Sequence, residues 1–310
     1  MMYYFIVNES SGRGAARKAW LEMKREMSAA GVPFAAWTTR CAGDATALAR
    51  AASALPEKEV KLIVVGGDGT INEVINGITD FERVALGIVP MGSGNDFVRG
   101  VGLARSPREA MKIIYHAKTC RLIDVGEVRV DGHAPRRFGI SAGVGLDARV
   151  CYEVEGSRHK TWLNRFGLGN LSYGLQTLSV VANMKRASGD VRFVTPSGIE
   201  SCRVEELLFL SAMNCPREGG GVPIAPTAHV NDGLFTACMV DGLSRHEAFM
   251  CLPLVAVGKH TRVPGVTYLN ASHIEMSLDT PLIVHADGEV LGCGHDIVFD
   301  IKPKALRLLA

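Results

Sequence analysis

Val65-Gly66-Gly67-Asp68-Gly69-Thr70-Ile71-Asn72-Glu73 decides the fold, because here a short apolar strand runs into a glycine turn and then a helix. Residues 61–65 (KLIVV) have the apolar pattern of a buried strand, and apolar residues return at helical spacing from Ile71. Without Cβ atoms, the three glycines let the backbone turn sharply and bring its N–H groups against a ligand. The helix start adds unpaired N–H donors and the positive end of a dipole, so the turn suits a phosphate.

Asp68 lies inside this turn, where a lone acid would repel phosphate unless a cation lies between them. We therefore expect Asp68 to act through Mg²⁺, directly or through water. The alternative is an ordinary strand-to-helix turn in which Asp68 caps the helix, and the pattern alone leaves both interpretations open.

Bulk composition sets the class of protein. A chain of 310 residues with 47% hydrophobic and 21% charged residues is typical of a globular protein with two domains. Its net charge of +2 does not indicate a nucleic-acid partner. Eight scattered cysteines without a C-x-x-C pair, and nine histidines without a cluster, favour reduced thiols in a cytoplasmic protein and no transition metal.

Membrane contact, if present, is predicted to be peripheral. The N-terminal residues lack a basic region and their apolar run is strand-length, so they do not resemble a signal peptide. The longest apolar stretch, residues 249–257, is too short for a transmembrane segment and contains Pro253.

The first 124 residues alternate strands and helices, which predicts an α/β domain with a doubly wound parallel sheet. Expected strands are residues 3–7, 34–39, 61–65 and 84–89, and expected helices are residues 15–30, 44–54 and 106–117. Ligands bind at the carboxyl ends of such strands. Besides the central turn, residues 8–14 and Pro90-Met91-Gly92-Ser93-Gly94-Asn95-Asp96-Phe97 follow strands there. Each could also be a plain connection, the second one capped by Asn95 or Asp96.

From residue 125 the pattern changes to short strands separated by Gly, Pro, Asn and Asp. This pattern predicts a β-sandwich domain over residues 125–296. Residues 297–310 are expected to return to the first domain. Residues 126–130 and 138–142 read as a hairpin around Asp131-Gly132. Residues 143–148 fit G-x-G-x-x-A, but no βαβ unit is expected there, so we reject a dinucleotide site. Later strands are expected over 190–194, 199–212, 233–240, 273–278, 282–285, 289–291 and 296–301, after a basic segment (156–172) and a helix (173–185).

These motifs together resemble the soluble bacterial diacylglycerol kinases, within the lipid kinase family that includes sphingosine kinases. The resemblance rests on residues 66–76, 87–99, 8–12 and the late Asp287-Gly288-Glu289, and further family markers cover nearly the whole chain. It implies a nucleotide domain, a β-sandwich domain and an active site in the cleft between them.

The resemblance also implies the site residues. ATP would be bound by Asn8, Glu9, Ser10, Ser11, Gly12, Thr39, Gly66, Gly67, Asp68, Gly69, Thr70, Ile71, Asn72, Ser93, Asn95 and Asp96. Asp68 would organise the catalytic Mg²⁺, with Asp96 and Asp124 as further acids. His229, Asp232 and Leu234 resemble a second Mg²⁺ site, in which Asp232 is the side-chain ligand and the other two use carbonyls. Two positions depart from the family pattern: Glu9 replaces a proline, and Ser93 replaces a threonine.

Asp287-Gly288-Glu289 is by its pattern alone a hairpin turn. The resemblance makes Glu289 the general base. On an extended strand Asp287 would face the same way, so we expect it to support Glu289, and the sequence leaves open which of the two is the base. His285 is interpreted as a packing residue.

The expected function is therefore an ATP- and Mg²⁺-dependent lipid kinase that phosphorylates diacylglycerol or a similar lipid, giving phosphatidic acid, as a cytoplasmic protein peripheral at the inner membrane face. An NAD kinase-like enzyme and a non-enzymatic nucleotide-binding regulator are the alternatives. The sequence does not identify the lipid, and it leaves a homodimer open.

Overall fold

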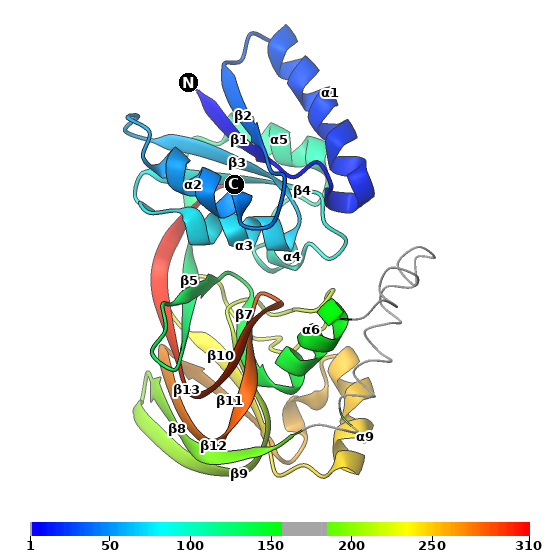
Figure 1. Ribbon diagram of the computed structural model, residues 1–310, viewed down its shortest axis with the longest axis vertical. Coiled ribbons are helices and arrows are strands. Elements are labelled where there is room, and N and C mark those ends of the chain that lie inside the picture. Colours follow the sequence, from blue (N-terminus) through cyan, green and yellow to red (C-terminus); the bar gives the residue numbers. More distant parts are fainter. Residues whose placement is uncertain (1, 157–180, 182–184) are drawn as a thin grey trace. The chain divides into compact units, whose positions relative to one another are not determined.

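The structure, a computed structural model, describes residues 2–156, 181 and 185–310, which Figure 1 shows in colour. The chain divides into two compact units. Unit 1 comprises Met1–Val125, Val230–Asp232 and Lys302–Ala310, and unit 2 comprises Gly126–His229 and Gly233–Ile301. The first segment of unit 1 ends one residue later than predicted, and the bounds differ at two further places. Residues 230–232 join unit 1, where the Asp124 N–H donates to the Val230 carbonyl at 2.7 Å. Residues 297–301 stay in unit 2, because β-pairing there continues to Asp300.

Unit 1 contains strands and helices in alternation. Its elements are β1 (Tyr3–Val7), the 3₁₀ turn η1 (Ser11–Gly14), α1 (Ala15–Ala29), β2 (Phe34–Thr38), α2 (Asp44–Ser53), β3 (Val60–Gly66), α3 (Asp68–Gly77), β4 (Val84–Pro90), α4 (Asp96–Gly100) and α5 (Pro107–His116). The strands pair in the order β2-β1-β3-β4, all parallel, as the alternation predicted.

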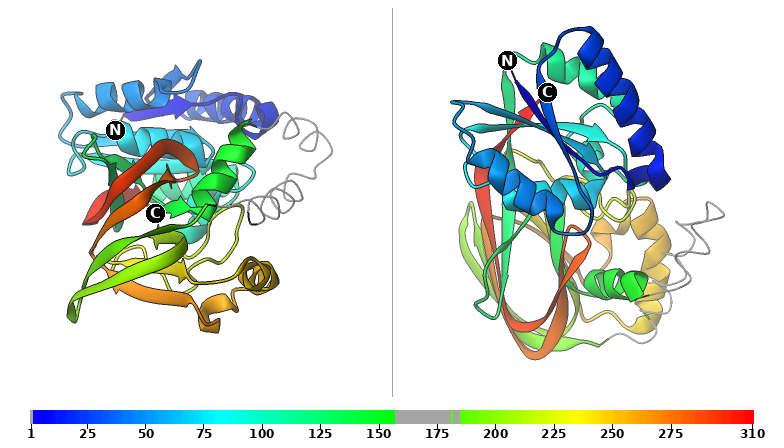
Figure 2. Two further views of the ribbon diagram at one scale, coloured as in Figure 1. Left: turned by 60° about the horizontal axis from the view of Figure 1, so that its bottom comes forward. Right: turned by 45° about the horizontal axis from the view of Figure 1, so that its top comes forward.

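Helices pack on this sheet through apolar stripes. One core cluster joins α1 and α5 to alternate residues of the strands, with Trp20 of α1 and Ile114 of α5 against Phe5, Ile63 and Val89. In addition, α2 and α3 pack closely together: a Cβ on Gly77 would lie 2.3 Å from the Thr46 carbonyl oxygen, so no other residue fits there without a shift. Figure 2 gives two further views of these helices. The packing fixes the position of α3 against α2.

Unit 2 is mainly antiparallel. Its elements are β6 (Arg136–Phe138), β7 (Ser141–Gly145), α6 (Leu146–Gly156), β8 (Ala187–Thr195), β9 (Gly198–Met213), β10 (Phe235–Asp241), α9 (Arg245–Ala256), η2 (His260–Arg262), β11 (Val266–Ala271) and β12 (His273–Ala286). The long strands β9 and β12 each pair with β7 along one part and with β8 along another. This pairing encloses an apolar core that includes Phe138, Phe193, Phe235 and Phe299.

Two long strands carry the chain between the units: β5 (Cys120–Val130) leads from unit 1 into unit 2, and β13 (Glu289–Leu309) leads back. In unit 1 the end of β13 adds a parallel strand beside β4, with Arg307 opposite Ala85 and Leu308 opposite Leu86. The two pairs of strands predicted over residues 273–285 and 289–301 are therefore two continuous strands, β12 and β13, interrupted in their mutual pairing by register shifts.

Two features of unit 2 differ from the predictions. Helices α6 and α9 and strand β11 were not predicted. One strand was expected over 138–142, whereas β6 ends at Phe138 and β7 begins at Ser141. A helix, α6, does follow the G-x-G-x-x-A segment, but β7 pairs antiparallel with β9 and β12, so the segment opens no βαβ unit. The basic segment 156–172 and the helix 173–185 lie almost wholly outside the described residues.

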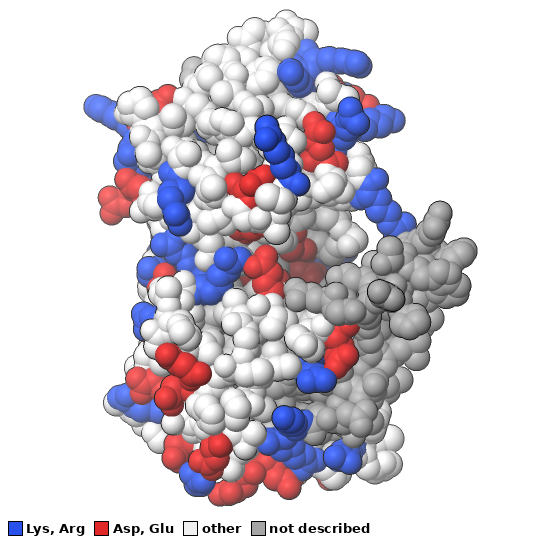
Figure 3. Space-filling model, in the orientation of Figure 1, with Lys and Arg blue, Asp and Glu red and all other residues white. Residues whose placement is uncertain are grey.

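Surface charge is mixed rather than segregated. On the face shown in Figure 3, basic and acidic side chains are interspersed, in keeping with the net charge of +2. Among the described residues, no helix is both long and apolar enough to cross a membrane.

Candidate phosphate-binding site and catalytic turn

The predicted phosphate-binding loops leave one edge of the parallel sheet side by side. Residues 8–12 follow β1, residues 67–70 follow β3 and residues 91–95 follow β4. The strand register pairs Val7 with Val65 and Gly66 with Pro90, so the three loops begin at the same level. This carboxyl edge is where parallel sheets bind their ligands.

The Asn8 side chain hydrogen-bonds the first loop to the central turn. Its side-chain Nδ2 donates to Thr70 Oγ1 at 2.9 Å, and its Oδ1 accepts from the hydroxyl of Ser10 at 2.7 Å. This side chain therefore connects the two loops. Glu9, the acid that replaces the family's proline, lies 3.8 Å from Arg17, whose positive charge offsets it. Thr39 follows β2, and its N–H donates to the Val7 carbonyl at 2.9 Å.

Glycines allow the loops to approach one another more closely than side chains would permit. Gly12 has φ of 60°, and a Cβ there would lie 2.6 Å from the Met91 carbonyl oxygen. A Cβ on Gly67 would lie 3.0 Å from the Cα of Gly92. Backbone exposed in this way can bring N–H groups against phosphate oxygens, so the loops fit the phosphates of a nucleotide.

Asp68 is the first residue of α3, and its carboxylate reaches the next loop. Its Oδ2 accepts from the Asp96 N–H and its Oδ1 from the Phe97 N–H, both at 3.1 Å. The capping interpretation is thus half right, since Asp68 caps the neighbouring helix α4, whereas Gly67 is the N-cap of α3.

A second acid approaches the same point. A Cβ on Gly94 would lie 3.3 Å from Asp68 Oδ2 and 3.5 Å from Asp96 Oδ2, so both carboxylates converge there. Carboxylate oxygens are the ligands that Mg²⁺ takes alongside substrate phosphates. The residues present therefore fit Mg²⁺, and Asp68 and Asp96 would hold it.

Other predicted ATP residues shape the loops. The Gly92 N–H donates to Asn95 Oδ1, and Asn95 Nδ2 donates to the Gly92 carbonyl, both at 2.9 Å, so this amide closes the loop around Ser93. Ile71 and Asn72 are each only 1% exposed, which leaves their side chains in the core. Whether these residues also contact ATP stays a prediction, as it does for the remaining loop residues Ser11, Gly69 and Thr70.

Asp287 and Gly288 form the predicted tight turn, between β12 and β13, with φ of 48° and 86°. The Asp287 carboxylate accepts backbone N–H bonds from Gly139 at 2.8 Å, Ile140 at 2.8 Å and Ser141 at 3.1 Å. It was wrong to place Asp287 on an extended strand beside Glu289, because a left-handed turn residue points elsewhere. These bonds also explain why the predicted strand 138–142 is interrupted.

Replacing Asp287 by asparagine is expected to lower the free energy of unfolding by about 1–3 kcal/mol, because an amide nitrogen would face a buried backbone N–H. Denaturant unfolding at neutral pH measures this loss. Asp279→Asn, which changes an exposed acid of the same unit, is the matched control and should change stability by much less. Equal effects of the two substitutions would contradict the role assigned to Asp287.

Glu289 begins β13 and forms an ion pair with Arg136 of β6. The glutamate side chain is 38% exposed, so its carboxylate is accessible to solvent and to a substrate hydroxyl. A neighbouring guanidinium stabilises the ionised carboxylate, which is the form that can accept a proton.

His285, which was predicted to be a packing residue, is buried and also makes polar contacts next to the turn at Asp287 and Gly288. It is 2% exposed; its Nε2 lies 3.1 Å from Asp147 Oδ2, and its Nδ1 accepts a hydrogen bond from the Gly288 N–H at 3.3 Å. Burial lowers the pKa of His285, but the attraction and hydrogen bond of Asp147, with the charges of Glu218 and Asp287, outweigh burial and raise this pKa above its ordinary value of 6.5.

Because the pKa of His285 is higher in the folded protein than in the unfolded chain, protonation of His285 stabilises the folded state. This contribution is complete below the unfolded pKa of about 6.5 and is lost as the pH rises through the folded pKa. We therefore expect the melting temperature of the wild type to fall as the pH rises above about 6.5. The melting temperature of His285→Gln, which cannot be protonated at this position, should fall less over the same range. Differential scanning calorimetry over this range measures both slopes. His133→Gln, an exposed histidine of unit 2, is the control and should follow wild type; parallel curves for wild type and His285→Gln would refute the assignment.

The remaining predicted residues lie in both units. Asp124 is fully buried in unit 1 and accepts the Lys304 N–H at 2.6 Å, which ties β5 to the returning end of β13. Asp232 belongs to unit 1, and His229 and Leu234 belong to unit 2. Within the described residues no cluster of three or more His, Cys, Asp or Glu side chains could hold a metal. A site built largely from backbone carbonyls is not tested by that finding, so the second Mg²⁺ site stays a prediction.

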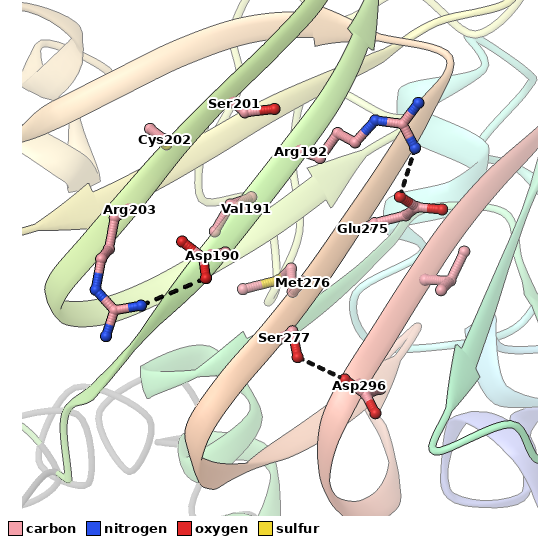
Figure 4. A pocket seen from close by; sticks show the side chains of 11 residues that line it. Asp190, Val191, Arg192, Ser201, Cys202, Arg203, Glu275, Met276, Ser277 and Asp296 are labelled. Atoms are coloured by element: carbon pink, nitrogen blue, oxygen red, sulfur yellow. Dashed lines mark hydrogen bonds and ion pairs between the residues drawn. The ribbon is translucent and has the colours of Figure 1, made fainter.

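Elsewhere in unit 2, strands β8, β9, β12 and β13 line a surface hollow of about 610 Å³. Figure 4 shows that its arginines are paired with acids, Arg192 with Glu275 and Arg203 with Asp190. The hollow contains none of the predicted site residues, and its paired charges do not mark an anion site.

The strand-end loops and their converging acids lie in a chain whose two halves both match known protein families. Residues 2–128 match the family described as "Diacylglycerol kinase catalytic domain", and residues 140–310 match the "YegS C-terminal NAD kinase beta sandwich-like domain".

Relatives that match over most of their length are named as lipid kinases. The chain is 30% identical over 294 residues to the Bacillus subtilis protein named "Putative lipid kinase YtlR", covering 94% of each protein. It is 32% identical over 288 residues to the diacylglycerol kinase of Staphylococcus saprophyticus, covering 93% of this chain and 88% of that protein. The fold matches a crystal structure of a diacylglycerol kinase from Bacillus anthracis with a TM-score of 0.68 at 19% identity, covering 99% and 96% of the two chains.

The chain belongs to the diacylglycerol kinase family of lipid kinases. The predicted two-domain organisation, with a catalytic α/β part followed by a β-sandwich-like domain, is confirmed.

Proposed function

We propose that this chain transfers the γ-phosphoryl group of ATP to the hydroxyl of diacylglycerol or a similar lipid, giving phosphatidic acid when the acceptor is diacylglycerol. The observation that carries the proposal is the convergence of Asp68 and Asp96 on Gly94, at the edge where three glycine-bearing loops leave the sheet. Support comes from family membership and from relatives named diacylglycerol kinase.

Each part of the chain has a role in this proposal. The loops after β1, β3 and β4 bind the nucleotide phosphates, and Asp68 and Asp96 hold Mg²⁺. When bound, Mg²⁺ neutralises charge on the phosphates. Glu289 accepts the proton of the lipid hydroxyl, and its ion pair with Arg136 orients the carboxylate. Asp287 fixes the turn that presents Glu289 by holding residues 139–141.

The proposed location is the inner membrane face, where the protein binds peripherally and reaches a substrate that stays in the bilayer. A second candidate function is phosphorylation of NAD, which the description of the C-terminal family favours because it contains "NAD kinase". The acid at Glu289 and the loop at 91–97 favour the lipid substrate.

ADP release measured against diacylglycerol, sphingosine, phosphatidylglycerol and NAD, each with and without Mg²⁺, distinguishes these functions. Release that requires Mg²⁺ and a lipid alcohol supports the proposal, and release with NAD alone supports the second candidate. Nucleotide binding without turnover of any acceptor would instead indicate a regulator.

A further inference from the structure

Helix α9 has apolar residues on both of its faces, although it is a surface helix. One face packs into a core cluster: Ala248 and Cys251 are buried, and Phe249 and Leu252 pack toward Val240 and Leu243. A surface helix of a globular domain is ordinarily polar on its other side. The opposite side of α9 instead carries Met250, 64% exposed, Leu254, 38% exposed, and Val257, 63% exposed.

These three residues form one patch, which we call the α9 patch. They are spaced at i, i+4 and i+7, so they follow one side of the helix and its C-terminal end. The described residues include seven exposed large apolar side chains, and three of them lie in this patch. Figure 1 shows α9 beside the strands of unit 2 rather than between them. Exposed apolar side chains gathered in this way mark an interaction surface.

The charges flanking the α9 patch identify its partner. Between residues 245 and 262 the basic side chains Arg245, Lys259 and Arg262 stand against a single acid, Glu247. The Glu247 carboxylate is engaged in a capping box, accepting the Ser244 N–H at 2.8 Å. An amphipathic surface that combines exposed apolar residues with flanking cations fits an anionic lipid bilayer.

A second copy of this chain fits less well. A two-fold contact through this patch would bring the excess positive charge of residues 245–262 of one copy close to that of the other. Like charges would then face each other without a free acid on the helix to balance them. The membrane surface imposes no such repulsion.

We propose that the α9 patch is the surface through which unit 2 docks on anionic membranes, with Met250, Leu254 and Val257 entering the interface and Lys259 and Arg262 contacting lipid headgroups. The inference rests on the proposed function, because a kinase of membrane lipids must reach a bilayer. It names a docking element that the sequence analysis missed.

Co-sedimentation with vesicles tests the proposal. We expect wild type to bind vesicles of phosphatidylcholine mixed with phosphatidylglycerol, and high salt to weaken this binding. Met250→Asp combined with Val257→Asp should reduce the bound fraction on the order of tenfold or more, because two apolar side chains lose their burial. Ile199→Asp, which places the same charge at an apolar position of unit 2 that is 61% exposed, is the matched control and should bind as wild type.

Other outcomes are equally decisive. If the double variant binds vesicles as wild type does, the proposal is overturned. It is also overturned if light scattering shows a wild-type dimer that the double variant dissociates while vesicle binding is unchanged, because the patch then meets a second copy. If the double variant unfolds, Met250→Gln with Val257→Gln replaces it and should show the same loss.

A soluble assay separates docking from chemistry. Turnover of a short-chain, water-soluble diacylglycerol should be the same for wild type, the double variant and the control. Absence of turnover in all three would count against the proposed kinase function, while vesicle binding would still decide the role of α9.

Discussion

Glu289→Gln is expected to lower kcat by about 10²–10⁴-fold, which is the usual cost of losing a general base. A lipid hydroxyl is a poor nucleophile until its proton has an acceptor, and glutamine is a poor acceptor of a proton. ATP binding should survive, because the phosphate-binding loops lie in unit 1 and are unchanged. Steady-state kinetics with diacylglycerol measure kcat, and binding of a fluorescent ATP analogue measures affinity.

Asp287→Asn supplies the comparison for this experiment. The Asp287 carboxylate accepts three backbone N–H bonds. Asp287→Asn should therefore lower the free energy of unfolding more than it lowers kcat. A variant Glu289→Gln with unchanged kcat, beside an Asp287→Asn variant that is folded but inactive, would assign the base to Asp287 instead. If neither substitution alters kcat in folded protein, the kinase mechanism proposed for this turn is wrong.

Asp68→Asn is expected to reduce turnover on the order of 10²-fold or more, since charge stabilisation by a metal ion is worth several kcal/mol. The Mg²⁺ concentration for half-maximal activity should rise in parallel. The substitution also weakens the cap on α4, which costs about 1 kcal/mol of stability. A lowered melting temperature alone therefore does not identify the role of Asp68.

Asp80→Asn is the matched control for that effect. Asp80 Oδ1 accepts the backbone N–H groups of Glu82 and Arg83, both at 3.1 Å, but Asp80 precedes β4 and so lies at the opposite edge of the sheet. The Asp80→Asn variant should lose about as much stability as Asp68→Asn and should keep wild-type activity. If Asp68→Asn behaves like Asp80→Asn in both respects, Asp68 is only a capping residue.

Local patterns predicted most of unit 1. Its strands are continuous apolar runs and its helices have separate apolar stripes, so each element is specified by neighbouring residues. The loops that follow β3 and β4 were predicted for the same reason, because glycine and acidic residues cluster immediately after those strands.

Features that depend on distant residues were not predictable in this way. The interruption at 139–140 is caused by Asp287, nearly 150 positions away, and the pairing of His285 with Asp147 joins residues similarly far apart. The sequence also gave no sign that Asn8 would bond to Thr70. Such contacts follow from the completed fold, and one sequence contains no local signal for them.

Helix α9 was missed for a different reason. Because both of its faces are apolar, it lacks the amphipathic period by which helices are recognised. A usable signal was present in Ser244 and Glu247, three residues apart before an apolar run, which is the pattern of a capping box. The same double-sided apolarity that hid the helix is the basis for its proposed role.

Unit 1 is assembled from three separated pieces of chain, and this has a consequence for its synthesis on the ribosome. The strand beside β4 is supplied by residues 302–310, which emerge only after all of unit 2. Until then, one side of β4 has an open edge that can pair with another nascent chain. Such sequence-distant pairing also slows folding. We expect nascent chains to need chaperones most during synthesis of unit 2, when the α/β sheet is formed but not yet closed by its last strand.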